Sequence, residues 1–116
     1  MEGTKTKRRN YLRTYRRRLG LSQAEVAQLL SCRLGTKISR HERGVREPRI
    51  KALMAYQILF DIPLAEMFPR LHASIRQEIL RQIHGLEQRL TTRHGSEFKR
   101  RSLRAIAARC GAPSEN

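Results

Sequence analysis

The side chains of this chain that could do chemistry are mostly basic. Its 116 residues include 25 Lys and Arg but only 10 Asp and Glu, which gives a formal net charge of +15. A field of this sign attracts polyanions, and nucleic acid is the first candidate among them. A basic composition also fits an RNA-binding protein or a peripheral membrane helix, so the spacing of residues along the chain has to decide.

The residues that could bind a metal ion or catalyse a reaction do not have the spacing that these functions need. Cys32, Cys110 and the four histidines show no CxxC, HxxxH or HExxH spacing, so we expect no metal site and no cofactor. No Ser/His/Asp or Cys/His combination stands in a glycine-rich or strand context, and no phosphate-cradling loop is present. The sequence therefore predicts a protein that is not an enzyme.

Composition also limits the core and the location of the protein. Hydrophobic residues make up 39% of the chain and aromatic residues only 5%, which predicts an aliphatic core. No apolar segment reaches the roughly 18 residues needed to span a bilayer, and no secretory signal follows the basic N-terminus. The two distant cysteines do not predict a disulfide framework. We expect a cytoplasmic protein with no membrane partner.

The spacing of apolar residues predicts three short helices between residues 10 and 44. An apolar stripe spaced by three and four residues runs from Leu12 to Leu19, and Gly20 follows where a left-handed residue ends a helix. Ser22 and Glu25 have the spacing of a capping box, which begins a second helix that ends near residue 30. A third helix is expected from about residue 36 and stops at the glycine at position 44.

Two more helices complete an all-α domain over residues 10–68. After Pro48, an apolar series predicts a largely buried fourth helix, and after Pro63 a fifth, short helix follows. The apolar residues of the fourth helix are Ile50, Leu53, Met54, Ile58 and Leu59. No strand is expected, and residues 1–9 read as a basic flexible arm that could follow phosphates or a minor groove.

The C-terminal part has a different pattern. Residues 69–93 read as a long amphipathic helix with a narrow apolar seam formed by Ile75, Ile79, Ile83, Leu86 and Leu90. Two alternatives remain for this seam: it pairs with a second copy, which we favour, or it folds back on the domain as extra core. Residues 94–116 form a basic segment with room for one short helix.

The second and third helices have the residues that a steeply crossed helix pair requires. Ala27 supplies a small side chain at the crossing, while Val26, Leu30 and Ile38 supply apolar contacts above and below it. When other helices cover the back of such a pair, its second helix protrudes. A protruding helix fits the major groove of B-DNA, which is about 12 Å wide.

The segment from Leu12 to Phe68 resembles the phage-repressor-like, or Xre-type, helix-turn-helix family. The resemblance covers about half of the chain and rests on the order and spacing of its motifs. These are Leu-x-x-Tyr-Arg ahead of Gly20-Leu-Ser-Gln23, Val-Ala at 26–27, Ile-Ser-Arg at 38–40, Glu42-Arg-Gly44, Pro48, and Leu64-x-x-Met-Phe68. It implies an all-α, five-helix DNA-binding domain, here followed by the amphipathic C-terminal helix.

The resemblance also implies roles for individual residues. Base contacts fall to Thr36, Lys37 and Arg40, phosphate contacts to Gln23, Arg33, Arg43 and Arg46, and a structural ion pair to Arg16 and Glu42. The chemistry agrees, because Arg and Lys donate to guanine O6 and N7 and Thr contacts a thymine methyl group. Thr36 has an alternative role as the cap of the third helix.

The sequence departs from the family pattern in the turn and in the third helix. Leu30 and Ile38 lie eight positions apart, one residue more than is usual in the family. Ser31 replaces the usual turn glycine, and Gly35 stands where relatives often present a base-reading side chain. His41 takes a normally aliphatic position, and we expect it at the edge of the core.

The resemblance predicts a sequence-specific double-stranded DNA-binding transcriptional regulator of the prokaryotic nucleoid. We expect a repressor that binds a short inverted repeat as a homodimer. Two alternatives remain open. One is an antitoxin whose C-terminal part binds a small partner protein. The other is a basic protein that bridges RNA or a coactivator.

Overall fold

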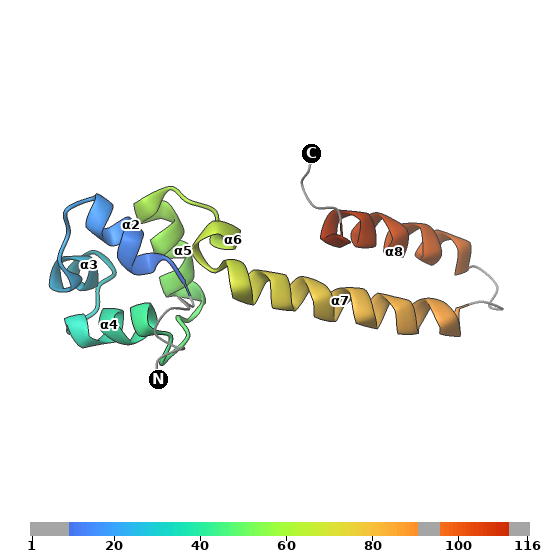
Figure 1. The fold of residues 1–116 in the computed structure, drawn as a ribbon, viewed down its shortest axis with the longest axis horizontal. Coiled ribbons are helices and arrows are strands. Elements are labelled where there is room, and N and C mark those ends of the chain that lie inside the picture. The colour runs from blue at the N-terminus through green and yellow to red at the C-terminus, as the bar shows by residue number, and fades with distance from the viewer. Residues whose placement is uncertain (1–9, 91–95, 112–116) are drawn as a thin grey trace, which may run out of the picture. The chain divides into compact units, whose positions relative to one another are not determined.

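The computed structural model describes residues 10–90 and 96–111, and every regular element in these two ranges is helical. The helices are α2 (Leu12–Arg18), α3 (Gln23–Leu29), α4 (Gly35–Arg43), α5 (Ile50–Phe60), α6 (Leu64–Met67), α7 (Pro69–Arg89) and α8 (Ser96–Gly111) (Figure 1). The predicted arm of residues 1–9 lies outside the described residues. The chain divides into two compact units, Met1–His72 and Ala73–Asn116, and α7 belongs to both.

The all-α prediction is confirmed, whereas the expected count of five helices followed by one is wrong. Seven helices are present in the described residues, because the segment after residue 94 forms a helix of 16 residues. The seam pattern predicted a helix over 69–93, and α7 ends at Arg89. Gly85 lies inside α7 without interrupting it.

The core of the first unit is formed by side chains from five short helices. Its buried members are Leu12, Val26, Ala27, Ile38, Tyr56, Phe60, Met67 and Phe68. The expectation of an aliphatic core is wrong here, because three of these eight side chains are aromatic. The rings of Tyr56 and Phe60 stack with centroids 5.8 Å apart. Few aromatic residues are present in the chain, but this small core gathers half of them.

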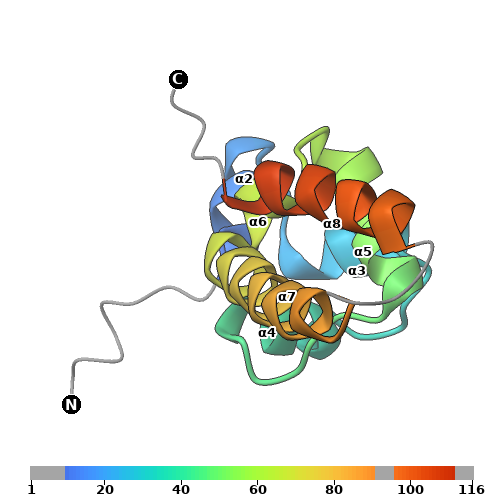
Figure 2. The ribbon, with the colours of Figure 1, turned by 90° about the vertical axis from the view of Figure 1, so that its right-hand side faces the viewer.

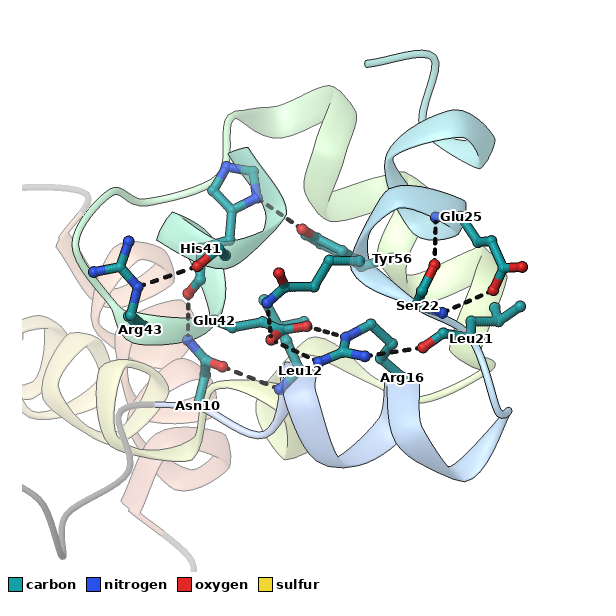
Figure 3. Close-up of polar contacts among 12 residues, drawn as sticks. Asn10, Leu12, Arg16, Leu21, Ser22, Glu25, His41, Glu42, Arg43 and Tyr56 are labelled. Carbon is teal, nitrogen blue, oxygen red and sulfur yellow. Dashed lines mark hydrogen bonds and ion pairs between the residues drawn. The ribbon is translucent and has the colours of Figure 1, made fainter. Parts of the chain in front are cut away.

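The sequence signals at the ends of the helices are confirmed. The hydroxyl oxygen of Ser22 accepts a hydrogen bond from the Glu25 amide at 3.0 Å, and the Ser22 amide donates to the Glu25 carboxylate at 2.8 Å (Figure 3). Gly20 and Gly44 both adopt left-handed backbone, with φ of 73° and 75°; Gly20 follows Leu19, the cap of α2, and Gly44 comes directly after α4. These residues fix the lengths of the first three helices.

The turn between α3 and α4 accounts for two departures from the family pattern. Ser31 is left-handed, with φ of 61°, so it adopts the conformation that a glycine would otherwise supply. Gly35 begins α4, one residue earlier than expected. A Cβ atom at Gly35 would lie 3.2 Å from the backbone nitrogen of Ala24, so the missing side chain lets α4 approach α3 closely.

The prediction that α5 is largely buried is wrong. Ile50, Met54 and Ile58 are 68%, 59% and 80% exposed, while Tyr56 and Phe60 face the core. The helix is apolar around most of its circumference. Its sequence pattern therefore predicted a helix correctly but could not show which side packs.

The second unit pairs α7 with α8 in antiparallel orientation (Figures 1 and 2). At one end, the guanidinium of Arg100 donates to the carbonyl oxygen of Leu90 at 2.8 Å. At the other end, the side chain of Leu80 lies 4.0 Å from the position of a Cβ atom on Gly111. Ile83 and Leu90 of the predicted seam are buried. The two alternatives for the seam were a second copy of the chain and the N-terminal domain, and α8 was neither of them.

We expect the Ser31→Gly variant to be more stable than the wild type by about 0.5 to 1 kcal/mol. The left-handed conformation costs a non-glycine residue about 1–2 kcal/mol, and the greater entropy of unfolded glycine offsets part of the gain. The free energy of unfolding from urea titration measures the change. Gly20→Ser is the matched control and should destabilise, since nothing lies within 4 Å of a Cβ atom there and backbone strain acts alone. A loss of stability in Ser31→Gly would contradict the prediction.

Candidate nucleic-acid interface

Helix α4 has one face in the core and one face in solvent. Ile38 and His41 are 1% and 2% exposed. The side chains of Thr36, Lys37, Arg40 and Arg43 are exposed. Positions 36, 40 and 43 are separated by four and three residues, which places them on the same side of the helix. A threonine and two arginines therefore form one outward-facing row, with a lysine beside it.

The segment around α4 is strongly cationic on its exposed side. Residues 33–49 contain six basic residues and two glutamates. All six basic side chains are exposed: Arg33, Lys37, Arg40, Arg43, Arg46 and Arg49. Arg33 lies in the turn before α4, and Arg46 follows the helix. The guanidinium of Arg43 also donates to the hydroxyl of Ser39 at 3.2 Å, within the same helix.

The capping role considered for Thr36 is wrong. The cap of α4 is Leu34, and no side-chain hydrogen bond closes that end of the helix. Thr36 is the second residue of α4 and its side chain is exposed, so it does not cap the helix. The backbone amide of Lys37 instead donates to the carbonyl oxygen of Leu34 at 3.3 Å.

The ion pair implied for Arg16 and Glu42 is present and buried. The Arg16 Nε and Glu42 Oε2 atoms are 2.5 Å apart, and the two side chains are only 10% and 4% exposed. A second guanidinium nitrogen donates to Glu42 Oε1 at 3.1 Å, and a third donates to the carbonyl oxygen of Leu21 at 2.9 Å. The hydrogen bond with Glu42 raises the pKa of Arg16. This arrangement joins α2 to the end of α4.

Gln23 belongs to the same buried cluster. Its side-chain amide donates to Glu42 Oε1 at 3.0 Å, so one carboxylate binds residues from both α2 and α3. The phosphate contact implied for Gln23 stays a prediction. In the structure this half-buried side chain orients α3 against α4.

His41 lies fully in the core, although we expected it at the edge. Its Nδ1 atom is 2.7 Å from the hydroxyl oxygen of Tyr56, and the two rings meet edge to face. Burial lowers the pKa of His41, and the positive charges of Lys37 and Arg46 lower it further. Burial also raises the pKa of Tyr56. Both groups are therefore held neutral near neutral pH.

The sequence did not single out Asn10 or Tyr56 as partners of α4. The side-chain amide of Asn10 donates to the carbonyl oxygen of His41 at 2.9 Å, and its oxygen accepts from the Leu12 amide at 3.0 Å. The Tyr11 amide donates to the carbonyl oxygen of Met67 at 2.9 Å. The bond between Asn10 and Leu12 is local, whereas the contacts of Asn10 with His41 and of Tyr11 with Met67 join residues far apart in the chain, so no local spacing could have indicated those two.

Within the described ranges, no group of three His, Cys, Asp or Glu side chains is placed to hold a metal ion. Cys32 and Cys110 are half-buried and free. None of the helices described is long and apolar enough to cross a membrane.

Comparison of the chain with protein-family models, curated proteins and solved structures gave no match.

We expect removal of the Glu42 carboxylate to destabilise the fold strongly. In the Glu42→Met variant the Arg16 guanidinium loses its partner while it stays buried, and breaking a buried pair in this way costs about 3–5 kcal/mol. The Arg16→Met/Glu42→Met double variant should recover most of that loss, because no unpaired charge remains. Urea unfolding followed by circular dichroism measures both. Equal stability of the single and the double variant would show that the unpaired Arg16 guanidinium carries no cost, which would contradict the prediction.

We expect the stability of the fold to decrease as the pH falls below about 6.5. The pKa of His41 is lower in the folded state than its usual value of 6.5, so the unfolded chain binds the additional proton first. The stabilisation is fully present above that pH and is lost as protons bind the unfolded state. Thermal unfolding between pH 5.5 and 7.5 measures the slope. His41→Gln should flatten it, because the buried imidazole is removed. An unchanged slope in His41→Gln would refute the assignment of this pH dependence to His41.

Proposed function

We propose that this chain binds double-stranded DNA with the exposed side of α4 in the major groove. In this proposal it is a sequence-specific transcriptional regulator that represses as a homodimer. One observation carries the proposal: a short helix presents a row of Thr and Arg side chains to solvent, while its opposite side is fixed by buried polar contacts. The resemblance of residues 12–68 to the Xre-type family supports the same function.

Fixation of α4 matters because base recognition requires side chains at defined positions. Ile38 and His41 anchor the helix in the core, and Glu42 connects its C-terminal end to α2 and α3. Asn10 connects the same end to the start of α2. The exposed side chains therefore project from a rigid support.

The dimensions and chemistry of α4 suit the groove. Its nine residues give a length of about 13 Å at 1.5 Å per residue. In the proposal, Thr36, Lys37 and Arg40 contact base edges. Arg33, Arg43 and Arg46 neutralise phosphates on either side and supply much of the affinity. Gly35 contributes no base contact, because it has no side chain.

The same geometry favours DNA over double-stranded RNA. A-form RNA has a deep and narrow major groove that side chains on a helix cannot read. The described aromatic residues that lie together are buried in the core rather than displayed for stacking on single strands. Competition between duplex DNA and structured RNA at physiological salt separates the two ligands.

Selection from random duplex DNA is the experiment that tests the proposal, and we expect it to recover a palindromic consensus. On that consensus, Arg40→Ala should weaken binding by about 1–3 kcal/mol, with little change on random duplex, because a lost base contact acts only at its own site. Arg46→Ala is the matched comparison. It should weaken binding to all sequences and reduce the slope of log K against log salt by about one. Failure to enrich any sequence would overturn the proposed function. Equal weakening of both duplexes by Arg40→Ala would remove only its role in base recognition.

A further inference from the structure

The outer side of α5 carries an apolar stripe. We use the name α5 stripe for Ile50, Met54 and Ile58, which are 68%, 59% and 80% exposed. They follow one another at intervals of four residues and so lie along one side of the helix. An exposed cluster of large apolar side chains is a common mark of a protein interaction site.

The α5 stripe is poor in charge, in contrast to the rest of the chain. Lys51 is the one charged residue within α5, in a protein of net charge +15. Polyanions bind where basic side chains gather, and they do not gather on this side of α5. The residues outside the described ranges are almost all polar, with only Met1, Ala112 and Pro113 as apolar exceptions. They offer little apolar surface that could cover the stripe.

We infer that two copies of this chain pair through the α5 stripe. The order Ile-Met-Ile is the same in both directions along the helix. An antiparallel pair with its two-fold axis at Met54 therefore places Ile50 against Ile58 of the partner subunit at both ends. This self-complementarity is what a two-fold interface requires. The three side chains of the stripe are uncharged and Lys51, three residues before Met54 and so beside the stripe, is the one cation within α5, so two cationic molecules meet there with little repulsion.

The size of the stripe determines how strongly the copies pair. Helix α5 has 11 residues and is about 16 Å long, so the contact is smaller than the roughly 800 Å² per partner of a standard stable interface. Free dimers are therefore weak, and pairing strengthens when both copies occupy one duplex. The stronger pairing on a duplex rests on the proposed function, whereas the pairing of free copies does not. The α7 seam is a poorer candidate, since Ile83 and Leu90 are buried and its other members are less exposed than the α5 stripe, with Ile75 at 50%, Ile79 at 39% and Leu86 at 37%.

Sedimentation velocity of the full chain without DNA, over a roughly thousandfold range of concentration, tests the pairing. The wild type should shift from monomer to dimer with increasing concentration. Met54→Lys places two like charges at the axis and should raise the dissociation constant at least about tenfold. Ile75→Lys, at an α7 position that is 50% exposed, is the matched control and should behave as the wild type. Circular dichroism verifies that both variants remain helical.

Disulfide trapping tests the position of the axis independently. In a Cys32→Ser/Cys110→Ser background, Met54→Cys should form a covalent dimer, because the two positions face each other. Lys51→Cys should form much less. In the antiparallel pair the two cysteines at position 51 are offset from each other by six residues along the helix axis, and disulfides need Cα atoms within about 7 Å. Equal trapping at both positions, or none at position 54, would overturn the inference.

Several results would contradict the inference directly. They are a wild type that stays monomeric at all concentrations, a Met54→Lys variant that dimerises normally, and loss of the dimer only in Ile75→Lys. A chain that dimerises through α5 but binds no duplex would refute the proposed function alone. A Met54→Lys variant that still binds a single half-site would show that the two proposals are separable.

Discussion

The arrangement of α2, α3 and α4 depends on one buried carboxylate. Glu42 accepts hydrogen bonds from Arg16 of α2 and from Gln23 of α3, while it belongs to α4 itself. A buried charge is tolerable only if it is paired and hydrogen-bonded, so the three helices must keep the mutual positions that satisfy it. Apolar packing alone would allow these short helices to slide. The carboxylate makes their register specific.

A second polar cluster fixes the same, C-terminal end of this helix. The ring of His41 contacts the Tyr56 hydroxyl, and the carbonyl oxygen of His41 accepts from Asn10. Both contacts are buried, which makes them stronger than they would be in water and costly to leave unsatisfied. In a unit with so small an apolar core, these contacts hold α4 at several points. The helix thus remains rigid although its outer side touches nothing in the described chain.

Local signals in the sequence were sufficient for the start of α3 and for the C-terminal ends of α2 and α4. The capping box at Ser22 and the left-handed glycines at 20 and 44 act within a few residues, so spacing alone revealed them. The ion pair of Arg16 and Glu42 came from family resemblance, since no local rule joins positions 26 apart. The contact of His41 with Tyr56 was beyond reach, because histidine at an aliphatic position gives no indication of its distant partner. The exposed side of α5 was misjudged for a related reason. A helix that is apolar nearly all round gives no preferred direction, and only tertiary packing selects one.

The glycine at position 35 limits how the surface of α4 can diversify. A Cβ atom there would lie 3.2 Å from the backbone nitrogen of Ala24, so a side chain requires that neighbouring backbone to give by a few tenths of an ångström. Substitutions at 36, 37 and 40 meet no such barrier, since those side chains reach only solvent. Engineering or evolution can therefore rewrite the outer row freely while the framework beneath it stays unchanged. The exposed row would then change through three or four surface positions, while a side chain at the first residue of the helix would require the neighbouring backbone to shift.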